Sequence, residues 1–338
     1  MNNKPTIHDI AKALGIDSST VSRALNDSPR VTQVTKDKIL AKAEELGYQR
    51  NMLASNLRKN ITHTIGVVVP RISRHFFSSA IQGIEETAFL AGYNVIICQS
   101  LEQLEREKKI VDGLVANRVD GLLISVSMET FNYNHLEVLK KSNIPVIFFD
   151  RHCDVPGFSN VLIDDFKGGF DATEHLILKG CRHIVHLSGP QGLEIYKNRF
   201  EGYKAALKQN NITYNKDYVV SSRLMEQDGY LSMQELLGKN LPVDGVFAAN
   251  DISAIGAMKF AKEQQISIPN TIAFVGFSNE PVSEIIEPSL TTIDQSGFEI
   301  GKVATELVLE HIANKNTVQK EQTILIDTHL IERNSSKQ

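Results

Sequence analysis

Residues 18–26, SSTVSRALN, combine a narrow apolar stripe with side chains that can all form hydrogen bonds. Val21, Ala24 and Leu25 recur at helical spacing and predict one inward face. The rest of this helix is polar and carries no carboxylate: Ser18, Ser19, Thr20, Ser22, Arg23 and Asn26. Such hydroxyl, guanidinium and amide groups bond to phosphates and to base edges. The segment is therefore suited to face DNA, and the alternative is the solvated face of a small helical bundle.

A second group of side chains is suited to binding a small polar molecule. Phe76 and Phe77 follow an apolar run, and an aromatic face packs well against sugar C–H groups or a purine. Asp150 closes PVIFFD, and its carboxylate can accept hydrogen bonds from two sugar hydroxyls. Each has a structural alternative: both phenylalanines could belong to the core, and Asp150 could pair with Arg151. The sequence leaves both open.

The motifs of several enzyme classes are missing. The chain contains no G-x-G-x-x-G after an apolar run, no phosphate-loop glycine-lysine-threonine and no G-x-S-x-G. Cys181, His183 and His186 lie close together in CRHIVH, but His183 and His186 point to opposite faces of a strand. We therefore expect no enzyme activity, no metal and no cofactor.

Three short helices are expected to position the polar face within the first sixty residues. TIHDIAKAL opens with Thr6 and Asp9 in a variant of the capping pattern, and Gly15 ends the helix. The polar helix follows within three residues, and a turn around Pro29 leads to a longer helix ending at Gly47. Two short helices joined by a tight turn with glycine form a helix-turn-helix, whose second helix enters the major groove.

From residue 64 onward, short β-branched runs alternate with longer amphipathic stretches. The runs are TIGVVV, NVIICQ, GLLISV, PVIFFD, HIVHLSG, GVFAAN and IAFVGF. This alternation predicts parallel sheets covered by helices. About 280 residues with this many strands fit two α/β lobes better than one, and ligands bind at the strand ends of such sheets.

Composition and charge agree with a water-soluble DNA-binding protein. No apolar run approaches a membrane span, the N-terminus lacks the layout of a signal peptide, and we expect a cytoplasmic protein. Cys98, Cys153 and Cys181 lack metal or redox spacing and are expected to be free thiols. The net charge is −4, yet residues 1–60 hold ten Lys/Arg against six Asp/Glu. The basic excess thus lies at the end that carries the polar helix.

Residues 6–60 resemble, without a gap, the DNA-binding headpiece and hinge of the lactose/galactose-repressor family. TVSRALN and the pattern V…T…I…A…ELGY…N…A..L carry this resemblance. It implies that Ser18, Ser19 and Arg23 read bases and that Thr20 and Ser22 contact phosphates. Thr6 and Asn26 complete the DNA contacts expected in the headpiece.

The resemblance extends to the hinge. It implies that Asn51 opens a short hinge helix, that Leu57 wedges into the central base step from the minor groove, and that Arg58 lies beside it. A wedge that unstacks a step lets bent DNA contact more protein. The alternative is that Leu57 packs against its own domain.

The remainder resembles the same family, whose core is like a periplasmic sugar-binding protein. IGVVVP, DGLLIS, VLIDDFKGGFDATEHLI, NRFEGY, GVFAANDISAIGAM and PSLTTID are among the matching segments. The resemblance makes Arg199 a ligand-gripping arginine and Asn250 a ligand amide. Asp251 is expected to cap the helix that follows. The alternative for Arg199 is a surface charge. Family members often carry an acidic residue after VGF, where this chain has Ser278, which leaves room for a phosphorylated or acidic effector.

The expected architecture is a small all-α helix-turn-helix headpiece followed by an α/β core of two lobes like a periplasmic binding protein. The expected boundaries are residues 1–50 for the headpiece, 51–60 for the hinge helix and 61–338 for the effector-binding and dimerisation core. We expect the first lobe at about 61–162 and 293–323, and the second at about 163–292 and 324–338.

The resemblance implies a transcriptional regulator, most often a repressor, that acts as a homodimer on a near-palindromic DNA operator. A small effector related to a carbohydrate would bind between the lobes and set operator affinity. The rival hypothesis is a sugar-binding protein that does not bind DNA. That class would carry an export signal and would lack the headpiece.

Overall fold

A computed structural model describes residues 5–48, 61–151, 156–239, 241–315 and 320–336. The chain forms two compact units, Met1–Thr62 and His63–Gln338. Among the described residues, no helix combines the length and the apolar character needed to cross a membrane.

The first unit contains the three predicted helices, α1 (Ile7–Leu14), α2 (Ser18–Leu25) and α3 (Gln33–Glu45). Its small core is built from one stripe of each helix: Ile10, Ala11, Val21, Ala24, Ile39 and Ala43. The Asp9 carboxylate accepts hydrogen bonds from the Thr6 amide and hydroxyl, both at 2.8 Å, at the start of α1. Gly15 ends α1 in the left-handed conformation that glycine adopts without strain.

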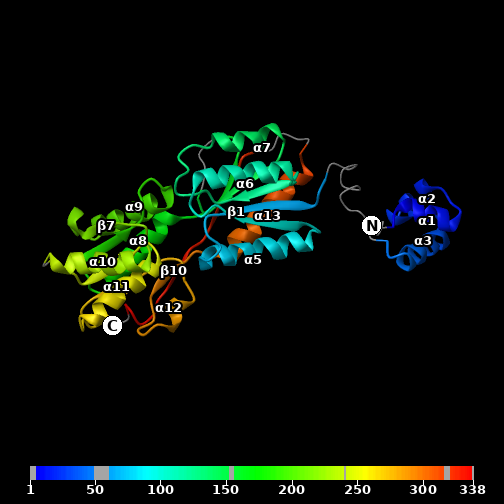
Figure 1. Ribbon diagram of the computed structural model, residues 1–338. Coiled ribbons are helices and arrows are strands. Elements are labelled where there is room, and N and C mark those ends of the chain that lie inside the picture. Colours follow the sequence, from blue (N-terminus) through cyan, green and yellow to red (C-terminus); the bar gives the residue numbers. More distant parts are fainter. Residues whose placement is uncertain (1–4, 49–60, 152–155, 240, 316–319, 337–338) are drawn as a thin grey trace. The chain divides into compact units, whose positions relative to one another are not determined.

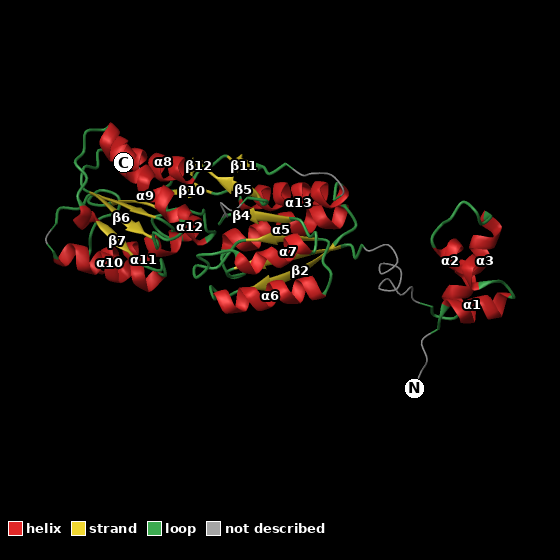
Figure 2. Ribbon diagram, turned by 90° about the horizontal axis from the view of Figure 1, so that it is seen from above, coloured by secondary structure: helices red, strands yellow, loops and turns green. Residues whose placement is uncertain are grey.

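The second unit contains two α/β lobes, as predicted (Figures 1 and 2). The first lobe has a six-stranded parallel sheet in the order β11-β5-β4-β3-β1-β2. Its strands are β1 (Thr64–Val69), β2 (Asn94–Gln99), β3 (Gly121–Ile124), β4 (Val146–Phe149), β5 (Ser159–Ile163) and β11 (Thr323–Ile326). Its helices are α5 (His75–Leu90), α6 (Leu104–Ala116), η1 (Asn134–Leu136), α7 (Glu137–Lys141) and α13 (Gly297–Ala313).

The helices of the first lobe cover both faces of its sheet, with α5 and α13 on one side and α6 and α7 on the other (Figure 1). Helices α5 and α13 pack very closely, because a Cβ atom on Gly301 would lie 2.0 Å from the carbonyl oxygen of Ala80. Strands such as β1, β3 and β4 are buried almost throughout, as expected for parallel strands covered on both faces.

The second lobe has a four-stranded parallel sheet in the order β7-β6-β8-β9. Its strands are β6 (Ile184–Ser188), β7 (Val219–Ser221), β8 (Gly245–Ala248) and β9 (Ala273–Val275). Its helices are α8 (Asp165–Leu178), α9 (Glu194–Gln209), η2 (Lys216–Tyr218), α10 (Glu226–Gly238), α11 (Asp251–Glu263) and α12 (Val282–Ile285). The seven strands predicted from the sequence are confirmed, four in the first lobe and three in the second.

The chain crosses between the lobes three times. It leaves the first lobe after β5, returns through β10 (Thr292–Asp294), and crosses again before β12 (His329–Ile331), which pairs antiparallel with β10. The expected last boundary, between residues 323 and 324, needs correction, because β11 pairs with β5 and belongs wholly to the first lobe. The end of the chain returns to the second lobe, where the Phe274 amide donates to the Ser335 carbonyl oxygen at 2.9 Å.

Candidate functional site

Helix α2 presents the polar face that the sequence predicts. Val21 and Ala24 are buried, whereas Ser19, Arg23 and Asn26 are exposed and Ser18, Thr20 and Ser22 are half-buried. Asp17 caps this helix, and its carboxylate accepts the Ser19 amide hydrogen at 2.7 Å. The Asn26 side-chain amide donates to the Ser22 carbonyl oxygen at 2.7 Å. The face therefore consists of short side chains around one long exposed guanidinium.

Thr6 lies exposed at the start of α1, where its hydroxyl is held by Asp9. The three expected hinge residues, Asn51, Leu57 and Arg58, lie outside the described residues. Their expected roles therefore stay predictions from the sequence.

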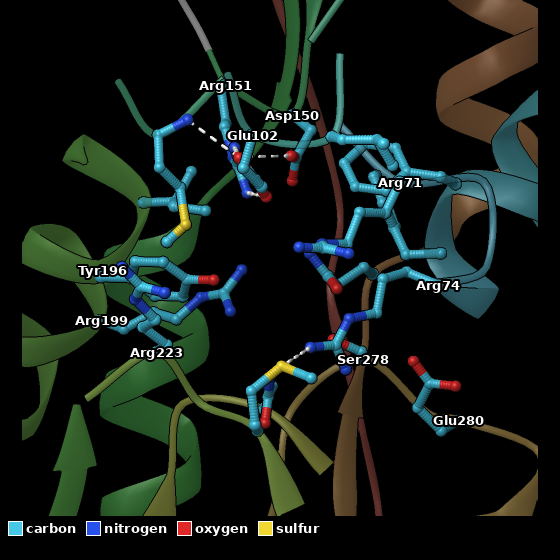
Figure 3. Close-up of a pocket in the computed structure, with 18 of the residues that line it drawn as sticks. Arg71, Arg74, Glu102, Asp150, Arg151, Tyr196, Arg199, Arg223, Ser278 and Glu280 are labelled. Atoms are coloured by element: carbon cyan, nitrogen blue, oxygen red, sulfur yellow. Dashed lines mark hydrogen bonds and ion pairs between the residues drawn. The ribbon is translucent and has the colours of Figure 1, made fainter. Parts of the chain in front are cut away.

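The second unit contains a cavity of about 380 Å³ between its two lobes (Figure 3). All six expected effector-binding residues line it, three from the first lobe and three from the second: Phe76, Phe77, Asp150, Arg199, Asn250 and Ser278. They come from the segments after β4, β8 and β9, from the start of α5 and from the second turn of α9, as expected for a ligand site at strand ends.

Phe76 and Phe77 are core residues and cavity residues at once. Their side chains are only about 7% and 6% exposed, and their ring centroids lie 5.1 Å apart in an edge-to-face arrangement. Phe77 also contacts Phe149 of β4, with ring centroids 6.4 Å apart. The two interpretations offered by the sequence are therefore compatible, because the core continues into the cavity wall.

Asp150 is buried in the cavity wall with one close hydrogen bond. The Ser125 hydroxyl donates to its Oδ2 at 3.1 Å, while the Arg151 Nε lies 3.8 Å from the same oxygen. Arg151 instead grips Glu102 with two guanidinium nitrogens, at 2.7 and 3.0 Å. Burial raises the pKa of Asp150, and Arg151 partly opposes this. The ion pair with Arg151 is thus secondary, and among the described residues only Ser125 donates a hydrogen bond to the Asp150 carboxylate.

Arg199 is not a surface charge, because its side chain is only 3% exposed. Its Nε donates to Asp165 Oδ1 at 2.7 Å and one terminal nitrogen donates to the Ala249 carbonyl oxygen at 2.7 Å. The guanidinium carbon lies 3.6 Å from the centroid of the Phe277 ring. Burial raises the pKa of Asp165 to about 6 even though Arg199 lowers it. Arg199 is therefore fixed from three sides while it still lines the cavity.

The expected capping role of Asp251 is wrong, because Asn250 caps α11. The Asn250 side-chain oxygen accepts the Ser253 amide hydrogen at 2.8 Å, and its amide donates to the Leu224 carbonyl oxygen at 3.0 Å. Asp251 is fully buried and accepts bonds from the Thr292 hydroxyl, the Ser283 hydroxyl and the Glu280 amide. Burial raises its pKa to about 6. Asp251 thus ties the cavity loop 278–283 to β10.

Ser278 lies in this loop and faces the cavity with a left-handed φ of 112°. Its amide donates to the Ile293 carbonyl oxygen at 2.8 Å, which fixes the loop against β10. The cavity therefore has a neutral hydroxyl at this point, and the nearest acidic residue in the loop, Glu280, also lines it. Burial raises the pKa of Glu280, and His75 and Arg74 lower it.

Several charged cavity residues escaped the sequence analysis. Arg71 and Arg74 follow β1, Arg223 follows β7, and Glu102 follows β2. Each lies just beyond the carboxyl end of a strand, so the rule that ligands bind at these ends could have identified them. Tyr196 of α9 also lines the cavity and had no comparable signal in the sequence.

The expectation that both histidines lie on one strand is wrong, because His183 precedes β6 and only His186 lies within it. His183 is exposed, whereas His186 is fully buried and stacks on Phe247 and Tyr203 with ring centroids 4.7 and 5.1 Å apart. Burial lowers the pKa of His186 to about 3. Cys181 is a buried free thiol and Cys98 a half-buried one, while Cys153 lies outside the described residues. Within the described part of the chain, no cluster of three His, Cys, Asp or Glu side chains could hold a metal ion.

Comparison with known proteins covers both units. Residues 6–51 match the model for bacterial regulatory proteins of the lacI family, and residues 62–334 match the model for periplasmic binding proteins and the sugar-binding domain of the LacI family. The ribose operon repressor of Halalkalibacterium halodurans is 32% identical, over 98% of this chain and 97% of the relative. The repressor CytR of Escherichia coli is 31% identical, over 98% and 96%.

The chain is also similar to solved structures of LacI-family regulators. A lac repressor dimer bound to operator and an anti-inducer has a TM-score of 0.87 and 25% identity, over 99% of both chains. A regulator from Enterococcus faecium with bound ribose has a TM-score of 0.71 and 30% identity, over 80% of this chain and 98% of that one.

Proposed function

The chain belongs to the LacI family of bacterial regulatory proteins, and from this premise we propose that it is a transcriptional repressor controlled by a small effector. The observation that carries the proposal is the combination of a helix-turn-helix unit with a polar α2 face and a second unit whose lobes enclose a cavity. A sugar-binding protein that does not act on DNA has no use for the first unit.

At the operator, α2 enters the major groove, and Ser18, Ser19 and Arg23 read base edges. Thr20 and Ser22 bond to phosphates, and Thr6 and Asn26 add contacts at the ends of α1 and α2. The absence of carboxylates from this face supports the assignment, because acidic groups would repel the DNA backbone. A guanidinium bound to one guanine gives about 1–3 kcal/mol of discrimination against other bases.

The hinge assignments rest on the sequence alone. We expect Asn51 to open a hinge helix, and Leu57 from each of two subunits to enter one central base step, with Arg58 beside it. Two subunits related by a two-fold axis read a near-palindrome. Since unstacking is cheapest at flexible steps, a pyrimidine–purine step is expected at the operator centre.

In the cavity, the effector is a sugar or sugar derivative. The Phe76 ring packs against C–H groups, Asp150 accepts hydroxyl hydrogens, and Arg199 donates to a ligand oxygen. Asp150 is suited to this role because, among the described residues, its carboxylate accepts a side-chain hydrogen bond only from Ser125 and can accept more. Asn250 and Ser278 line the same cavity and add contacts to the effector from the second lobe.

Effector and operator are coupled because the effector contacts both lobes while the first lobe continues from residues 51–60. A ligand that favours one lobe arrangement changes operator affinity, typically by 1–3 kcal/mol, and the operator changes effector affinity by the same factor. The protein acts as a homodimer in the cytoplasm, where its operator lies. The proposed function includes no catalysed reaction and requires no metal or cofactor.

A two-stage experiment tests the proposal. The full chain is screened by thermal shift against sugars, sugar phosphates and nucleosides, because a ligand that binds the folded state stabilises it. Stabilising compounds are then titrated into complexes with operator DNA selected from a random pool. A compound that stabilises the protein and changes operator affinity supports the proposal, and the direction of the change distinguishes induction from corepression. Failure to select any preferred DNA sequence would refute it.

A further inference from the structure

We propose that the effector carries a phosphate group, as a sugar monophosphate or as the free ion, bound by Arg71, Arg74 and Arg223 across the two lobes. This inference deepens the proposed function and rests on it. The observations that carry it are the charges of the cavity wall and the contacts that each charged group already makes.

Five arginines and four carboxylates line the cavity, and a fifth carboxylate, Asp165, pairs with one of these arginines from outside the lining. Two of the arginines are neutralised by the protein itself. Arg151 holds Glu102 with two hydrogen bonds of 2.7 and 3.0 Å, and Arg199 holds Asp165 at 2.7 Å. These two pairs are almost fully buried on the arginine side.

The other three arginines form no ion pair in contact with a carboxylate among the residues that the structure describes, although Arg74 is close enough to Glu280 to lower its pKa. The Arg74 guanidinium contacts the neutral sulfur of Met225, at 3.2 Å. The side chains of Arg71 and Arg223 make no hydrogen bond or ion pair with any described residue. Figure 3 shows Arg71 and Arg74 on one side of the cavity and Arg199 and Arg223 on the other. Positive groups from both lobes thus face one space.

None of the carboxylates of the wall forms an ion pair with Arg71, Arg74 or Arg223 among the residues that the structure describes. Glu102 is held by Arg151, and Glu129 accepts the Leu104 amide hydrogen at 3.0 Å. Burial raises the pKa of both Asp150 and Glu280, which opposes their ionisation. Three guanidinium groups thus face the cavity without an ion-pair partner among the described residues, and an anionic ligand would supply one.

A phosphate group satisfies this arrangement better than a neutral sugar does. It carries between one and two negative charges near neutral pH and offers three oxygens, and planar guanidinium groups bind it through paired hydrogen bonds. A phosphate held between Arg71 of the first lobe and Arg223 of the second would also join the lobes. Asp150 and Phe76 remain available to bind a sugar attached to it.

The test is a thermal-shift titration of the full chain at constant ionic strength, in which each charged probe replaces chloride and each neutral sugar is added at unchanged salt. The probes are ribose, ribose 5-phosphate, glucose, glucose 6-phosphate and inorganic phosphate. We expect saturable stabilisation by probes that carry phosphate. Arg71→Gln and Arg223→Gln should each weaken the response about tenfold, or about 1.4 kcal/mol. A larger response to one ester than to inorganic phosphate identifies a sugar phosphate, and an equal response identifies the free ion.

Two controls separate the cavity from other positive groups. Lys109→Gln removes one charge from the exposed face of α6 and should leave the phosphate response unchanged. Arg23→Ala should also retain it, which excludes binding to the headpiece.

The inference is overturned if no phosphate-bearing probe stabilises the wild type beyond chloride, or if Arg71→Gln and Arg223→Gln respond like the wild type. Stabilisation by a neutral sugar that exceeds that of its phosphate ester also overturns it. In each case the proposed function stands if a neutral compound still changes operator affinity, so the two failures are distinguishable.

Discussion

Replacing Arg199 with alanine tests how the cavity wall is held together, and the outcome should depend strongly on pH. The substitution removes the partner of Asp165, whose carboxylate is buried and bonded to Arg199 Nε at 2.7 Å. Breaking a buried pair by removing one partner costs about 3–5 kcal/mol. Asp165 can escape part of this cost by taking up a proton.

The magnitude follows from the pKa of Asp165, which burial raises to about 6 with Arg199 in place, against 3.8 for an unperturbed aspartate. A carboxyl with a raised pKa in the folded state stabilises the fold at low pH, and this contribution is lost as pH rises to the folded pKa. In the wild type the loss ends near pH 6. In Arg199→Ala the pKa of Asp165 rises further, so the free energy of unfolding continues to fall at higher pH. Between pH 5 and pH 8 this variant should lose about 2–3 kcal/mol more than the wild type.

The assay is urea unfolding at pH 5 and pH 8, at fixed protein concentration, followed by circular dichroism. The matched control is the double variant Asp165→Asn with Arg199→Ala, which should recover most of the pH-dependent loss. The recovery is not complete, because Arg199 also lowers the pKa of Asp150. Equal destabilisation by Arg199→Ala at both pH values, or no recovery in the double variant, would refute the assignment of this pair.

Three further predictions concern other parts of the chain. Burial lowers the pKa of His186 to about 3, so this side chain is uncharged in the folded protein and takes up a proton on unfolding below its ordinary pKa of 6.5. The free energy of unfolding therefore falls as pH falls, and His186→Phe should remove about 2 kcal/mol of this loss between pH 7 and pH 5. An unchanged pH slope in urea unfolding would contradict this. Gly301→Ala should lower the free energy of unfolding by about 1–3 kcal/mol, because the new methyl group would meet the Ala80 carbonyl oxygen. Gly113→Ala of α6, where the new methyl group meets no atom, should be neutral or slightly stabilising in the same assay. Arg23→Ala should abolish discrimination between operator and random DNA in anisotropy titrations while leaving the melting temperature unchanged, and full discrimination would show that α2 does not read bases there.

The helices and strands follow from the sequence because their signals are local. Thr6 and Gly15 mark the ends of α1, and the β-branched runs mark the buried parallel strands. The predicted last boundary between the lobes fell inside β11 because the sequence signal of this strand is weak. The strand lies at the edge of its sheet, and its residues alternate in exposure.

The cavity could be predicted only in part, because its chemistry depends on contacts between distant segments. The sequence indicated Arg199, but its partners Asp165 and Phe277 lie 34 and 78 positions away in the chain. Asn250 and Asp251 are adjacent, and only the loop 278–283 folding against β10 decides which of them caps α11. Arg71 and Arg223 were missed because a single arginine after a strand has no distinctive spacing.

The most direct test of the account is a reciprocity measurement on the full chain. Operator affinity is measured by anisotropy with and without saturating effector, and effector affinity is measured by calorimetry with and without saturating operator. We expect both affinities to change by the same factor, in the range of about 5-fold to 150-fold. An effector that binds the cavity with full affinity and leaves operator affinity unchanged would contradict it.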